Sequence, residues 1–129
     1  MTEPRFLLDS NICIYLLEGL SDEARQRAEQ CSPGELVTSA IAYAEVTRGL
    51  DPGNQSGVDV VRAFFRVVDV FPFDYAAAAR YSDVPFKRGR FDRLIAAHAL
   101  ALDLTLVTNN ERDFADVPAL RVENWTAPL

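Results

Sequence analysis

Short apolar runs alternate with amphipathic segments along this chain, and the alternation predicts its secondary structure. Apolar runs at residues 5–8, 36–38, 70–73 and 104–107 have the length of buried strands, and a further short strand is expected near residues 120–122. Pro72 would confine the third of these runs to an edge of the sheet, because proline has no amide hydrogen to donate. The pattern therefore predicts four to five short strands.

Helical periodicity separates these runs. The segment at residues 58–69 is the clearest case, because its apolar residues recur on one face and its charged residues on another. Capping residues mark two more helices: Thr38 or Ser39 before one that Gly49 ends, and Asp74 before "YAAAARYSD". The other helices are expected at residues 11–18, 21–31 and 91–102.

The alternation of short apolar strands with helices predicts an α/β fold. Its central sheet should be mostly parallel and flanked by helices on both faces, in one domain over residues 1–129. Ligands of such sheets bind beyond the carboxyl ends of the strands. That rule places Asp9, Ser39 and the "TNN" segment at residues 108–110 along one rim of the sheet.

Composition favours a cytoplasmic protein. No apolar run approaches the ~20 residues that span a bilayer, and the start "MTEPRF" does not resemble a signal peptide. Cys13 and Cys31 form no CxxC pattern, and two free, buried thiols in a reducing compartment are expected.

The formal net charge of −6 would argue against a nucleic-acid partner if totals alone mattered. However, basic residues gather in one stretch, at Arg80, Lys87, Arg88, Arg90 and Arg93. A basic lip beside an acidic pocket is one interpretation of this stretch, and an ordinary solvated loop is the other.

Three carboxylates stand where solubility alone does not require them. Asp9 follows the first apolar strand, Glu45 lies among small and apolar neighbours, and Asp92 opens the helix at residues 91–102. Asp92 could simply be a favourable anion at a helix N-terminus, and Glu45 could pair with Arg48 one turn away. Asp9 has no such simple explanation, because a lone buried carboxylate is costly.

Together the three acids predict a metal site. Carboxylates that share one pocket repel each other, and a hard divalent cation such as Mg²⁺ removes the conflict. A zinc site is poorly supported, because the chain has one histidine and no thiolate pair.

Other common chemistries find little support. His98 lies six residues after Asp92, roughly 120° around the same helix, and so is not expected to face the same pocket. Ser10, Ser39 and Ser82 lack a suitably spaced histidine for a serine triad. No GxxxxGK[ST] or GxGxxG segment is present to hold a nucleotide.

Four blocks in order, "LLDSN", "SAIAYAEVTRGL", "FDRLIAAHALALDLTLVTNNERDF" and "LRVENW", resemble PIN-domain proteins, and VapC-type toxins of bacterial toxin–antitoxin modules most of all. The resemblance covers essentially the whole chain. Its most specific part is the run from Asp92 to Phe114, where an acid opens a helix that leads into a strand and the "TNN" turn.

The resemblance implies a PIN-like fold and an endoribonuclease that depends on Mg²⁺, with Mn²⁺ as a possible substitute. Asp9, Glu45 and Asp92 match the family's metal-binding and catalytic acids, and Ser10 and Asn11 match polar residues beside the first acid. The fourth acidic position stays open between Asn110 and Asp113, and with it the choice between one metal ion and two.

From the chemistry of the residues, Arg93 or a neighbour in "KRGR" is expected to bind substrate phosphates, with Asn110 also at the substrate. The resemblance further implies an RNA substrate, a homodimer and a VapB-type antitoxin, with DNA contacted only through that antitoxin and no membrane partner. An antitoxin would fill the acidic pocket with Arg or Lys.

Two alternatives remain at this point. One is a catalytically silent PIN-like interaction module that keeps its acids. The other is a phosphotransfer enzyme with Asp9 as nucleophile, which the absence of an acid at Asn11 disfavours.

Overall fold

The computed structural model describes residues 3–128 and contains a five-stranded sheet in the order β3-β2-β1-β4-β5. All four strand pairs are parallel, which confirms the predicted α/β class. The third strand lies at an edge, as predicted, although it spans Asp69–Phe71 and Pro72 comes just after its end. The strands are β1 (Phe6–Leu8), β2 (Leu36–Ser39), β3 (Asp69–Phe71), β4 (Thr105–Val107) and β5 (Val122–Glu123).

The helices agree with the predicted order and differ mainly at their ends. The segment predicted at residues 58–69 begins earlier, because the Asn54 side chain caps it by accepting a hydrogen bond from the amide of Gly57 at 3.1 Å. It ends earlier because Asp69 joins β3. The α-helices are α1 (Ser10–Glu18), α2 (Asp22–Glu29), α3 (Ala40–Arg48), α4 (Gln55–Val67), α5 (Tyr75–Arg80) and α6 (Asp92–Leu102), with 3₁₀ turns η1 (Tyr81–Asp83) and η2 (Glu111–Phe114).

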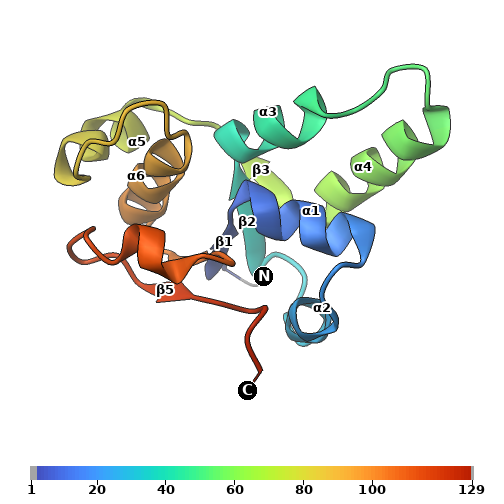
Figure 1. Cartoon of the computed structure of the whole chain (residues 1–129), viewed down its shortest axis with the longest axis horizontal. Coiled ribbons are helices and arrows are strands. Elements are labelled where there is room, and N and C mark those ends of the chain that lie inside the picture. Colours follow the sequence, from blue (N-terminus) through green and yellow to red (C-terminus); the bar gives the residue numbers. More distant parts are fainter. Residues whose placement is uncertain (1–2, 129) are drawn as a thin grey trace.

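The sheet separates two apolar cores, as Figure 1 shows with α5 and α6 on one side and α1, α2 and α4 on the other. Successive side chains of a strand point to opposite faces. Leu7 therefore packs with α6, whereas Phe6 and Leu8 pack with α1 and α2. Burial on both faces explains why β1 reads as a continuous apolar run.

The order of the strands reverses at β1. From β1 the chain moves outward through β2 to β3, then returns to the other side of β1 to form β4 and β5. Connections on the two sides of such a switch point diverge, and the space between them opens beyond the carboxyl ends of the strands. Here the segments that follow β1 and β4 border that space.

Both cysteines are free thiols, as predicted, although only Cys13 is fully buried and Cys31 is half-buried. Among residues 3–128, no helix is both long and apolar enough to cross a membrane.

Candidate functional site

A polar cleft of about 330 Å³ opens at this switch point. It brings together residues that are far apart in the sequence, and it includes every predicted site residue except Arg93. The predicted residues that line it are Asp9, Ser10, Asn11, Glu45, Asp92, Asn110 and Asp113, and Arg90 and Thr108 line it with them.

Asp9 lies at the floor of the cleft because it terminates β1 and caps α1. Its backbone amide donates to Val107 O at 3.0 Å, and its Oδ1 accepts from the amide of Ile12 at 2.9 Å. Burial raises the pKa of Asp9 to about 6, opposed by hydrogen bonds from Thr108 and Ile12 and reinforced by the charges of Asp92 and Glu45. A buried carboxylate close to other carboxylates is stabilised in its charged form by a bound cation.

Asp92 and Asp113 form an acidic pair that also lines the cleft. Asp92 opens α6, and Asp113 lies in η2, the turn that follows β4. Arg90 joins them: its Nη2 donates to Asp92 Oδ2 and, at 2.7 Å, to Asp113 Oδ2. Asn110 Nδ2 also donates to Asp113 Oδ2, at 2.9 Å. The fourth carboxylate at the cleft is thus that of Asp113, which Asn110 helps to position.

Glu45 reaches the cleft from α3. The Ser10 hydroxyl donates to its Oε1 at 2.8 Å, and within the described residues no ion pair forms between Glu45 and Arg48. Asn11 Nδ2 contacts Asn109 Oδ1 at 3.4 Å, which links the segment after β1 to the segment after β4. Both polar residues that follow Asp9 therefore support the cleft.

The prediction that Arg93 binds substrate phosphate is wrong for this structure. Arg93 is fully buried, and its guanidinium donates to Asp116 Oδ1 at 3.0 Å and to Asp113 O at 2.7 Å. The second residue of α6 faces the core, so this arginine ties η2 to the helix instead of meeting solvent. Its charge is already paired.

Arg90 and Thr108 line the cleft, although the sequence pattern assigns neither of them a role of its own there. Arg90 was one of several cations in "KRGR", and no local pattern distinguishes it from Arg88. Thr108 stands directly after a buried strand, as Asp9 does, and this position is the signal that marks it. Its side chain supports Asp9.

His98 and Ser39 lie away from the cleft, as the helical spacing predicted for His98. They contact each other through Nδ1 and Oγ at 2.8 Å, and both are buried. Ser39 also caps α3 by accepting from the amide of Ile41. These two residues hold α6 to the end of β2 and serve the fold.

The donors at the cleft suit a hard divalent cation. Carboxylate oxygens from four acids, together with hydroxyl and amide oxygens, are the ligand type that Mg²⁺ and Mn²⁺ prefer. In the arrangement present, however, no three acidic, histidine or cysteine side chains among residues 3–128 are grouped as a metal would require. The chemistry of the donors fits, while two of the acids are engaged by Arg90.

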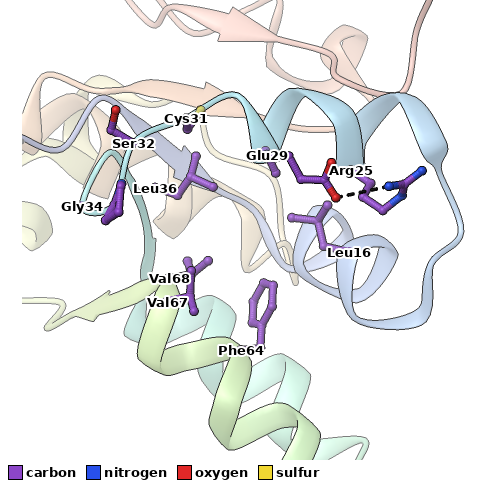
Figure 2. Close-up of a pocket in the computed structure, with 12 residues that line it drawn as sticks. Leu16, Arg25, Glu29, Cys31, Ser32, Gly34, Leu36, Phe64, Val67 and Val68 are labelled. Carbon is purple, nitrogen blue, oxygen red and sulfur yellow. Dashed lines mark hydrogen bonds and ion pairs between the residues drawn. The ribbon is translucent and has the colours of Figure 1, made fainter.

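A different hollow, shown in Figure 2, lies between α1, α2 and the end of α4. Leu16, Leu36, Phe64 and Val68 give it an apolar lining. An ion pair between Arg25 and Glu29, 3.2 Å long, lies at its edge. This hollow is mainly apolar, whereas the cleft at the switch point is lined by carboxylates.

Comparison with known proteins agrees with this geometry. The family described as PIN domain matches residues 6–120. The chain is 30% identical to the tRNA(fMet)-specific endonuclease VapC of Shigella flexneri, over 95% of this chain and 98% of the relative. It is 32% identical to ribonuclease VapC1 of Haemophilus influenzae strain R2866, over 94% and 98%.

Solved structures show the same likeness. The crystal structure of DNA-bound VapBC from Salmonella typhimurium superposes with a TM-score of 0.84 and 27% identity, over 95% of this chain and 98% of that chain. VapBC2 from Rickettsia felis, bound to a promoter DNA fragment, gives a TM-score of 0.82 and 26% identity, over 96% and 99%.

Proposed function

Because the chain belongs to the PIN-domain family, and within it to the VapC ribonucleases, we propose that it is a metal-dependent endoribonuclease and the toxin of a VapBC-type toxin–antitoxin module. The observation that carries the proposal is the gathering of Asp9, Glu45, Asp92 and Asp113 around one cleft at the switch point of the sheet. These acids come from four separate segments of the chain, namely the end of β1, α3, α6 and η2.

In the proposed site, Asp9 and Asp92 would hold a divalent cation, Mg²⁺ or in its place Mn²⁺. A bound cation of this kind polarises a phosphate oxygen and lowers the pKa of a coordinated water. Glu45, held by Ser10, is the group placed to accept a proton from the attacking water or to orient it. Asp113 is the remaining carboxylate of the cleft and would be a further ligand for the metal.

We propose RNA as the substrate, and tRNA(fMet) is the first RNA to test because the Shigella flexneri relative is named for it. With Arg93 buried, Arg88 becomes the leading candidate for a phosphate contact, since it is exposed on the loop that borders the cleft. Arg and Lys contacts to phosphates position a nucleic acid without reading its sequence. Such contacts would bring the backbone to the acids.

A VapB-type antitoxin is the proposed partner, because two of the solved structures similar to this chain are VapBC assemblies. The apolar hollow of Figure 2 offers a surface for an apolar segment of that partner, between α2 and α4. A basic side chain of the antitoxin could also enter the acidic cleft. The proposal includes a homodimer, with DNA reached only through the antitoxin, and action in the cytoplasm.

The decisive experiment is cleavage of end-labelled RNA by the purified protein with EDTA, Mg²⁺ or Mn²⁺. We expect cleavage only with a divalent cation, and we expect Asp92→Asn to remove it while the circular dichroism spectrum stays unchanged. In cells, induced expression should arrest growth, and co-expression of the neighbouring antitoxin gene should restore it. An Asp92→Asn protein that still cuts RNA would refute the proposed site.

The same experiment separates this proposal from a catalytically silent interaction module. A silent module would bind a partner and arrest no growth, and its RNA would stay intact with every metal. The four carboxylates disfavour that alternative, because clustered like charges destabilise a fold that does not use them.

A further inference from the structure

Arg90 donates three hydrogen bonds to carboxylates of the cleft. Its Nε donates to Asp92 Oδ1 at 3.2 Å, and its Nη2 donates to the other oxygen of Asp92. The same Nη2 reaches Asp113 Oδ2 at 2.7 Å. One guanidinium therefore bridges two acids that lie 21 residues apart in the sequence.

This arrangement places a positive charge of the chain itself where two of the proposed metal ligands meet. A planar guanidinium that binds a carboxylate through two nitrogens satisfies both carboxylate oxygens at once. While Arg90 is in place, Asp92 cannot turn its oxygens toward a metal without breaking these bonds. Two of the four carboxylates of the cleft are thus held in ion pairs with one arginine.

We propose that Arg90 is an internal cation that competes with the divalent metal for Asp92 and Asp113, so that metal binding requires the arginine to leave. This inference rests on the proposed metal-dependent function and concerns the same cleft. It assigns a role to a residue of the loop between η1 and α6, a segment with no metal ligand of its own.

The position of Arg90 allows such an exchange. Its side chain is 38% exposed, whereas that of Arg93, three residues further along, is fully buried. Arg90 precedes α6 in a loop without regular structure, next to Gly89 at φ +71°. Arginine–carboxylate pairs with this exposure are weak and easily screened. A doubly charged cation that also gains Asp9 and Glu45 can therefore replace a singly charged guanidinium.

The test measures metal binding to RNA-free protein. Mn²⁺ is titrated into wild type and Arg90→Gln, and free Mn²⁺ is followed by electron paramagnetic resonance. We expect the dissociation constant for Mn²⁺ to fall about three- to tenfold in Arg90→Gln, because the competing ion pairs are gone. Arg90→Lys, which keeps the charge without the planar fork, should lie between the two.

Arg88→Gln is the matched control. It removes the same charge from the same loop, and Arg88 forms no ion pair within residues 3–128. A long-range effect of net charge would shift both variants equally. Competition at the acids predicts a clear shift in Arg90→Gln and a small one in Arg88→Gln.

A second readout follows the arginine in the wild-type protein. Phenylglyoxal modifies accessible guanidinium groups, and mass spectrometry gives the rate at each site. Saturating Mg²⁺ should raise the modification rate of Arg90 and leave that of Arg88 unchanged. Neither measurement needs RNA or turnover.

Equal shifts in the two glutamine variants, or weaker Mn²⁺ binding in Arg90→Gln, would overturn the competition while leaving the metal-dependent nuclease intact. Failure of wild type and of both variants to bind Mn²⁺ or Mg²⁺ at millimolar concentration would overturn the proposed metal site and this inference together. A thermal melt of each variant confirms that the folded protein is being titrated.

Discussion

The Ser10 hydroxyl donates a hydrogen bond to Oε1 of Glu45 at 2.8 Å, across 35 residues of sequence. Ser10 is the first residue of α1, directly after Asp9, and Glu45 lies on α3. Glu45 is exposed, so without this bond its long side chain would sample many rotamers. The contact fixes a carboxylate beside Asp9 and couples two helices at the rim of the sheet.

We therefore expect Ser10→Ala to lower kcat/KM for RNA cleavage about fivefold, the effect of one hydrogen bond of ~1 kcal/mol, with little change in stability. Ser10→Thr, which keeps the hydroxyl, should retain most of the activity. Single-turnover cleavage at saturating Mg²⁺ measures the effect. Equal activity in the alanine and threonine variants would show that this bond does not position Glu45.

Asp9→Asn should separate stability from activity. Burial raises the pKa of Asp9 from 3.8 to about 6, so the folded protein binds this proton more tightly than the unfolded chain does. Stability is therefore lost as the pH rises from about 3.8 to 6, and the loss persists above pH 6. Asparagine stays neutral and can still cap α1.

At pH 7.5 in EDTA, Asp9→Asn should raise the free energy of unfolding by about 1–3 kcal/mol while cleavage is abolished. The gain should shrink as the pH is lowered toward 4. Urea unfolding at the two pH values, followed by circular dichroism, measures both quantities. A gain that is the same at both pH values would contradict the role assigned to the buried charge.

Arg88→Gln and Arg93→Gln form a pair with opposite expected effects. Arg93 is buried and bonded to Asp116 and to the backbone of Asp113, so its loss should cost about 2 kcal/mol of stability. The partner Asp116 is 40% exposed and can turn to water, which keeps the cost below that of a fully buried pair.

Arg88→Gln should instead leave stability unchanged and weaken RNA binding, lowering the salt slope by about 1. Both substitutions are introduced into the catalytically inactive Asp92→Asn protein. RNA binding is then measured at several salt concentrations, at a temperature below the Tm of each variant. A reduced salt slope in Arg93→Gln, with none in Arg88→Gln, would reverse the assignment of the two arginines.

The buried side chain of His98, which lies away from the cleft, should make the stability of the protein depend on pH. Burial lowers the pKa of His98, with a weaker opposing effect from Asp74. The unfolded chain therefore binds this proton more readily, and stability is lost as the pH falls below about 6.5. His98 is the single histidine, so its ring signals are easily assigned in NMR spectra.

We expect those signals to titrate with a midpoint below 6.5, and we expect His98→Gln to flatten the fall in stability between pH 6.5 and pH 5. Cleavage should change little in the folded variant, because His98 contacts Ser39 and Phe73 and not the cleft. A normal titration midpoint would contradict the burial of the ring.

The sequence by itself determined the elements and the rim on which the site lies. Short, nearly continuous apolar runs marked β1 and β4, since the residues of a strand that is covered on both faces are mostly apolar. The residue after each of these strands, Asp9 or Thr108, must then stand at the carboxyl edge of the sheet, where parallel strands leave room for a ligand. Such information is local, and a single sequence carries it.

Only the tertiary structure decided which cation meets which acid. Arg90 and Arg93 are three residues apart, on either side of Asp92. Arg90 bridges two acids of the cleft, whereas Arg93 is buried and donates to the backbone of η2. The partners of the two arginines depend on where Asp113 and Asp116 lie in the fold, about 20 residues further along the chain. Asp113 and Asp116 reach these arginines because β4 pairs with β1 and brings the segment after it to α6. The pattern of residues around Asp92 cannot predict this, because the energy of an ion pair depends on distance in space and not on distance in sequence.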